Sequence, residues 1–79
     1  MTFYTFMTRF HLEDESPRGE LARDMKQDRE RFPRNGNSKY AGWHRLIAGY
    51  LMDGGVCSGC MEAFEESWKE YLAYEGKGN

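Results

Sequence analysis

Apolar residues recur along this chain with the spacing of α-helices. The clearest case is the segment 61–74, where large apolar side chains fall three and four residues apart and charged residues fill most positions between them. That spacing places the apolar side chains on one face of a helix. The predicted inward face consists of Phe64, Trp68, Tyr71 and Leu72. Because large aromatic rings on one face need partners, we expect the earlier segments to pack around this helix.

Two helices are predicted in the first part of the chain. Thr2 can cap the first of them. Its apolar face consists of Phe3, Phe6, Met7 and Phe10. Residues 11–16 are expected to form a short polar linker. Ser16 and Pro17 then make a favourable start for the second helix, because serine is a good capping residue and proline at the first position gives up no helical hydrogen bond.

The second helix has a narrow apolar stripe, formed by Leu21, Ala22 and Met25. Phe32 would extend this stripe by two further turns. Pro33 is expected to end the helix at or before Phe32, because a residue that precedes proline avoids the helical conformation.

A third helix is predicted from Asn37 or Ser38, either of which can cap it, to about Met52. Its inward face consists of Tyr40, Trp43, Ile47 and Leu51. Gly42 and Gly49 lie two turns apart on the same side. Each costs about 1 kcal/mol relative to alanine inside a helix, so the pair indicates either the close approach of another element or a soft helix. The helix is expected to end at residues 53–55, where a glycine can adopt a left-handed cap.

These patterns predict an all-α protein, a compact bundle of four helices. We expect one domain at residues 1–75 and a frayed tail at 76–79. The predicted core consists of Phe3, Phe6, Phe10, Trp43, Phe64 and Trp68. No apolar run approaches the roughly 18 residues of a membrane span, and no signal peptide is evident. Two cysteines are too few for a disulfide scaffold, so we expect a cytoplasmic protein with no membrane association.

The order of several residues resembles the YozE-type SAM-like (sterile-alpha-motif-like) family of small uncharacterised bacterial and phage proteins. The matching positions are Phe3, Tyr4, Ala22, Asp28, Phe32, Pro33, Tyr40, Leu51, Phe64, Glu65, Trp68 and Tyr71. The resemblance covers nearly the whole chain and implies a compact SAM-like helical bundle. It implies no catalytic residues. The Gly54–Gly55 pair and the two cysteines depart from the family pattern.

Cys57 and Cys60 form the one motif with well-known chemistry, a CxxC pair at the start of the last helix. A thiolate there is favoured by the helix N-terminus, as in redox pairs, but redox pairs of this kind occur in a βαβ context. A structural zinc site needs four ligands, and only His11 and His44 remain as good candidates. We favour reduced, metal-free structural thiols over a redox pair or a zinc site, and we expect no cofactor.

Catalysis is not predicted. Acidic groups occur at residues 13–15 and at Glu65 and Glu66, on a linker and on a helix surface, whereas a general acid needs a desolvated pocket. No glycine-rich phosphate loop follows a strand, and no nucleophile has an evident base. The sequence therefore favours a protein that is not an enzyme.

Charge is unevenly distributed although the net charge is only −2. Residues 18–45 contain eight basic and four acidic residues, and residues 46–79 contain two basic and six acidic residues. The candidate partner-binding residues are Arg23, Lys26, Arg29, Arg31, Arg34 and Lys39. These side chains can contact a partner or nucleic-acid phosphates. They can also pair within helices, as Glu20 with Arg23 or Glu30 with Arg34.

We therefore expect a non-enzymatic protein-interaction module whose partner is another protein. A phage or mobile-element origin, with a host protein as the target, fits the same features. The oppositely charged halves also allow head-to-tail self-association, as in many SAM domains. The alternative hypothesis is a weak DNA- or RNA-binding domain that uses the basic segment 23–39, although acids within that segment and in the last helix repel a polyanion.

Overall fold

The computed structural model describes residues 1–40, 42–54 and 58–77, and it confirms an all-α fold. The helices are α1 (Phe3–Phe10), α2 (Pro17–Gln27), α3 (Gly42–Asp53) and α4 (Ser58–Lys77). The described residues contain no strand. α4 includes residues 76–77, where a frayed tail was expected, and residues 78–79 lie outside the described part. None of the described helices combines the length and the apolar character needed to cross a membrane.

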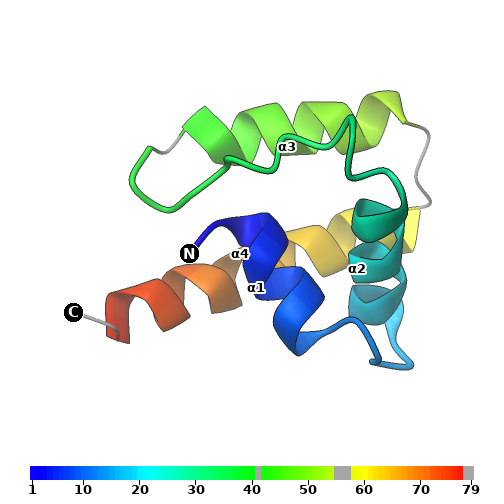
Figure 1. Ribbon diagram of the computed structural model, residues 1–79, viewed down its shortest axis with the longest axis horizontal. Coiled ribbons are helices and arrows are strands. Elements are labelled where there is room, and N and C mark those ends of the chain that lie inside the picture. The colour runs from blue at the N-terminus through cyan, green and yellow to red at the C-terminus, as the bar shows by residue number, and fades with distance from the viewer. Residues whose placement is uncertain (41, 55–57, 78–79) are drawn as a thin grey trace.

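The long helix α4 holds the other three helices together. Figure 1 shows α4 running across the molecule, with α1 crossing in front of it, α2 near one end and α3 along one side. α2 has the most extensive contact with α4, and α1 contacts both α2 and α4. α3 packs against α4, and its backbone does not come close to that of α2. The space between α2 and α3 is lined by side chains of both helices and by Phe32 from the segment that connects them.

The core forms where the aromatic face of α4 meets the start of α1. Thr2 caps α1 as predicted, since its hydroxyl accepts a hydrogen bond from the Thr5 amide at 3.2 Å. The Phe3 ring then lies 5.6 Å from Phe64 and 5.1 Å from Trp68, centroid to centroid. The other buried core residues are Phe6, Met7, Leu21, Ala22, Met25, Phe32, Ile47, Leu51, Ala63 and Tyr71. Trp43 is partly buried and packs against this cluster, as expected.

Two residues of α1 and α4 that were predicted to face inward are instead exposed. Phe10 is 46% exposed and Leu72 is 42% exposed. Phe10 is the last residue of α1. Its ring centroid lies 5.3 Å from that of Tyr74, which is near the C-terminal end of α4. Leu72 follows the buried Tyr71 directly, so it is turned about 100° away from it around the helix. The predicted apolar face of α4 was therefore too wide by one residue.

α2 ends earlier than predicted, at Gln27, and Phe32 reaches the core from a turn rather than from a helix. The amides of Arg31 and Phe32 both donate to the Asp28 carbonyl, each at 2.9 Å. Residues 28–31 are all charged and exposed. Because most helical stability in proteins comes from packing an apolar face, a helix across these four residues would gain no core contact.

α3 also begins later than predicted, at Gly42. Asn37 accepts a hydrogen bond from the Lys39 amide at 2.9 Å, which is a local turn and not a helix cap. Tyr40 precedes α3 and is 62% exposed, so its assignment to the inward face was wrong. Ile47 and Leu51 are buried as expected.

The glycine pair in α3 does not mark a close approach between helices. A Cβ on Gly49 would have no heavy atom within 4 Å, and one on Gly42 would meet the Tyr40 ring at 2.5 Å. The close approach is at Gly19 in α2, where a Cβ would lie 1.8 Å from the Asp14 carbonyl oxygen. Gly54 follows α3 without the left-handed backbone expected for a cap, and Gly55 lies outside the described residues.

Candidate partner-binding surfaces

All six basic residues of this segment are exposed, but Arg23 has a structural role that the other five lack. Arg23 donates hydrogen bonds to the carbonyls of Leu12 at 2.9 Å and Asp14 at 3.0 Å, so it holds the linker between α1 and α2. The other five basic residues are Lys26, Arg29, Arg31, Arg34 and Lys39, and all are exposed. None of these five has an ion pair within residues 1–40, 42–54 and 58–77.

The predicted pairing of Glu20 with Arg23 and of Glu30 with Arg34 does not occur, because Arg23 turns toward backbone carbonyls and the second pair lies beyond the end of α2. A pair four residues apart needs a continuous helix to bring its side chains together. The charges of the exposed basic residues are therefore not neutralised in the way that the sequence suggested.

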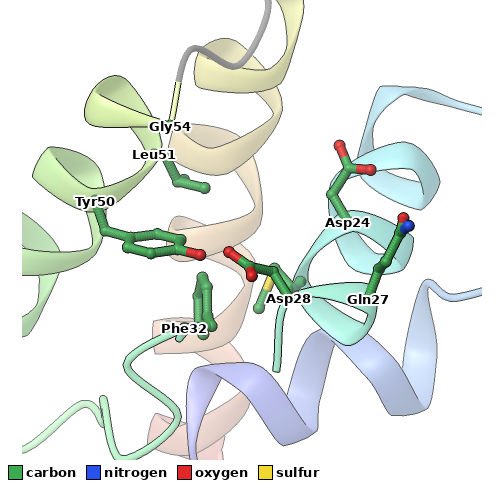
Figure 2. A pocket seen from close by; sticks show the side chains of 8 residues that line it. Asp24, Gln27, Asp28, Phe32, Tyr50, Leu51 and Gly54 are labelled. Atoms are coloured by element: carbon green, nitrogen blue, oxygen red, sulfur yellow. The ribbon is translucent and has the colours of Figure 1, made fainter. Parts of the chain in front are cut away.

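A hollow of about 480 Å³ opens between α2 and α3. Its lining residues are Asp24, Met25, Gln27, Asp28, Phe32, Tyr50, Leu51 and Gly54. The floor is apolar and buried, because Met25, Phe32 and Leu51 are each at most 3% exposed. Figure 2 shows the Tyr50 hydroxyl and the Asp28 carboxylate pointing toward one another across this hollow. The rim is thus acidic on the α2 side and phenolic on the α3 side.

A second hollow, of about 350 Å³, lies between α1 and the last turns of α4. Its lining residues are Phe6, Phe10, His11, Glu70, Ala73 and Tyr74. Three aromatic rings meet here at tilted angles, with centroid distances of 5.3 Å for Phe6 and Phe10, 5.3 Å for Phe10 and Tyr74, and 5.5 Å for Phe6 and Tyr74. We refer to these six residues as the aromatic hollow.

The fold and its landmarks agree with a known family. The family model described as the YozE SAM-like fold matches residues 2–73. The chain belongs to the YozE SAM-like family. No curated protein and no solved structure matches it.

Most YozE SAM-like landmarks lie in the core of the bundle. Phe3, Ala22, Phe32, Phe64 and Trp68 are all buried. Asp28, Tyr40 and Glu65 are exposed, so these three landmarks contribute no comparable apolar burial. The family pattern therefore describes mainly how the helices pack.

A polar network beside the aromatic hollow was not predicted from the sequence. His11, expected in a solvated linker, is only 9% exposed. Its Nδ1 lies 2.6 Å from the Asp14 carboxylate and its Nε2 contacts Glu70 of α4. Arg18 of α2 donates to the same Glu70 at 2.9 Å. His11 and Glu70 are 59 residues apart, so no local pattern could have joined them.

Both histidines that were considered as zinc ligands contact carboxylates. His44 lies 2.6 Å from the Glu65 carboxylate and stacks on Phe64. Cys60 is buried in the first turn of α4, and Cys57 lies outside the described residues. In the described part of the chain, no three or more histidine, cysteine or acidic side chains are grouped so that they could hold a metal ion.

Proposed function

We propose that this protein is a non-enzymatic protein-interaction module that anchors its partner in the aromatic hollow. The observation that carries this proposal is the half-exposed ring pair of Phe10 and Tyr74, which are 46% and 42% exposed. Large aromatic side chains are enriched among the residues that dominate protein–protein binding energy. Two such rings side by side on the surface of a 79-residue chain offer an anchor point of this kind.

The rings are held in place before any partner binds. Phe6 is 3% exposed and its ring lies 5.3 Å from Phe10 and 5.5 Å from Tyr74. These rings therefore lose little conformational freedom when a partner covers them, which lowers the entropic cost of binding. His11 and Glu70 border the hollow and supply a polar edge beside its apolar centre. An apolar centre with a polar rim is the usual anatomy of a protein interface.

The carboxylates support the absence of catalysis. The Glu65 and Glu66 side chains are 51% and 67% exposed. A carboxylate that stays solvated lacks the desolvation that prepares a general acid. These groups are better suited to solvation and to pairing with His44 and Arg18, which is what they do.

The exposed basic residues have a supporting role in this proposal. Lys26, Arg29, Arg31, Arg34 and Lys39 carry positive charge on a protein whose net charge is −2. Such a local excess steers the approach of an acidic partner surface and changes the association rate more than the final affinity. We therefore expect partner association to slow as ionic strength rises.

Site-specific photo-cross-linking tests the proposal. p-Benzoylphenylalanine is placed at Phe10 in one variant and at the exposed Tyr40 in a control, and both are irradiated in the cell that produces the protein. We expect a discrete adduct from position 10 that resists nuclease and is digested by protease, and no such adduct from position 40. A nuclease-sensitive adduct, equal adducts from both positions, or no adduct from position 10 would contradict the proposal.

Nucleic-acid binding remains the second candidate, because the five exposed basic side chains lack ion pairs within the described chain. Phosphates are the natural partners of such side chains. Against this, Asp24, Asp28 and Glu30 are exposed in the same stretch. Like charges at that range repel a polyanion, so this candidate ranks below the first.

A further inference from the structure

The hollow between α2 and α3 combines an apolar floor with two carboxylates that have no partner in the described chain. Asp24 and Asp28 are four residues apart, on successive turns at the end of α2, and both line the hollow. Neither side chain has a hydrogen bond or an ion pair within the described residues. Arg23, Lys26 and Arg29 flank these two residues in the sequence, yet none of the three forms an ion pair with either carboxylate within the described residues.

These two carboxylates stand where a helix disfavours them. Like charges four residues apart repel one another, and the C-terminal end of a helix carries a partial negative charge that repels both. Asp28 is the C-cap residue of α2. Both repulsions destabilise the fold, and such a cost is expected at a site where a bound ligand offsets it.

The aromatic walls select the kind of cation. The Phe32 and Tyr50 rings meet edge to face, with centroids 5.4 Å apart and planes at 86°. Phe32 belongs to the buried floor, and Tyr50 is partly buried on the α3 side. A planar guanidinium stacks on an aromatic face and donates from both edges, whereas an ammonium group is a compact point charge. An arginine also carries an alkyl stem that can cover apolar surface.

We propose that this hollow binds an arginine side chain presented by a partner protein, with the guanidinium between Asp24, Asp28 and Tyr50 and the alkyl stem over Phe32 and Leu51. Charge complementarity between the acidic rim and the guanidinium fixes the occupant. The hollow lies on α2 and α3, so this site is separate from the aromatic hollow of α1 and α4. The failure of either proposal leaves the other standing.

NMR titration with matched probes tests the site directly. N-acetyl-arginine amide is added to the ¹⁵N-labelled protein, and N-acetyl-citrulline amide serves as the uncharged isostere. We expect the arginine probe to shift the amide resonances of Asp28, Phe32 and Tyr50 with half-saturation at about 1 mM. The citrulline probe should bind about tenfold more weakly. The lysine analogue should also bind more weakly than arginine, because it cannot bridge both carboxylates while stacking.

Variants locate the binding and separate it from folding. Asp24→Asn combined with Asp28→Asn should weaken the arginine probe about tenfold while raising the melting temperature, since both charges oppose the helix. Glu20→Gln, an exposed acid on α2 that does not line the hollow, should leave probe binding unchanged. Equal binding of the arginine and citrulline probes, equal binding of arginine and lysine, or no shifts at these three amides would overturn the proposal.

Discussion

Ser67 places a polar side chain in the described core. Its side chain is fully buried in α4, and its hydroxyl has no hydrogen-bond partner within the described residues. A buried hydroxyl without a partner keeps the cost of leaving water and gains nothing in return. Removing this hydroxyl oxygen should therefore stabilise the fold.

Replacing Ser67 by alanine is therefore expected to raise the free energy of unfolding by about 1 kcal/mol. Thr8→Ala is the control, because the Thr8 hydroxyl donates to the Tyr4 carbonyl at 2.9 Å and its removal breaks a hydrogen bond. Urea unfolding of both variants measures the difference. A Ser67→Ala variant less stable than the wild type would show that the hydroxyl has a partner after all.

Tyr71 gives the fold a dependence on alkaline pH. Burial, and then the nearby Glu75 carboxylate, raise the pKa of Tyr71 above its usual 10.0. Above pH 10.0 the unfolded chain therefore loses this proton before the folded chain does. Folding stability contributed by this shift is complete below pH 10.0 and is lost as the pH rises through the folded pKa.

The Tyr71→Phe variant tests this sign. It loses the hydrogen bond that the Tyr71 hydroxyl donates to the Met1 carbonyl at 2.5 Å, so it should be less stable at neutral pH by about 1 kcal/mol. It should also lose less stability than the wild type between neutral and strongly alkaline pH. Denaturant melts across that range measure both effects. Parallel alkaline losses in the two proteins would contradict the assignment.

At the scale of helices, the sequence predicts the starts of α1 and α2 correctly but misses the start of α3 and the end of α2. Thr2 and Ser16 occupy the N-cap positions of α1 and α2 as expected, although only the Thr2 side chain makes a capping hydrogen bond. α2 ends about one turn before the predicted position, because the end of a helix depends on whether its next turn carries apolar side chains that can be buried. Phe32 fits the helical spacing, but the charged residues 28–31 before it contact no core.

Glycine positions show the same limit. Gly42 and Gly49 were conspicuous because they interrupt a predicted helix, yet the tight contact involves Gly19. That contact depends on how the linker returns over α2, with Arg23 holding the carbonyls of Leu12 and Asp14. Sequence spacing carries no information about this return path.

Two alanine substitutions test the difference between these glycines. Gly49→Ala should stabilise the protein by roughly 0.5–1 kcal/mol, because its Cβ enters open space and alanine favours the helix. Gly19→Ala should destabilise it by about 1–3 kcal/mol, because its Cβ would lie 1.8 Å from the Asp14 carbonyl oxygen. Thermal unfolding measures both. The same sign for the two variants would contradict the packing described for the linker.

At the scale of the whole molecule, the helix count, the all-α class and most of the core were predictable from apolar spacing alone. The candidate sites were not. The aromatic hollow exists because Phe10 turns outward beside Tyr74, although it shares the spacing of the buried Phe3 and Phe6. The hollow between α2 and α3 exists because Asp28 at the end of α2 lines the same space as Tyr50 and Leu51 of α3. Both facts concern residues distant in the sequence.

Electrostatics across the molecule predict weak nucleic-acid binding. With acids interspersed among the basic residues, we expect no affinity for duplex DNA or RNA tighter than about 10⁻⁶ M at physiological salt. Fluorescence anisotropy with labelled duplexes measures this. Binding through segment 23–39 would instead give a log–log salt slope of about −3 to −5. Submicromolar affinity that is lost on replacing Arg29 or Arg34 by alanine would reverse the ranking of the two functions.

The most direct test of the interaction module is calorimetry with the partner recovered by cross-linking at position 10. At about 150 mM salt, Phe10→Ala should raise the Kd by about tenfold or more, as expected for a central aromatic anchor. Tyr74→Ala should act in the same direction. Tyr40→Ala, which removes a more exposed ring outside the hollow, should change the Kd by less than about twofold. A Kd that Phe10→Ala leaves unchanged, or that Tyr40→Ala raises as much, would contradict the account.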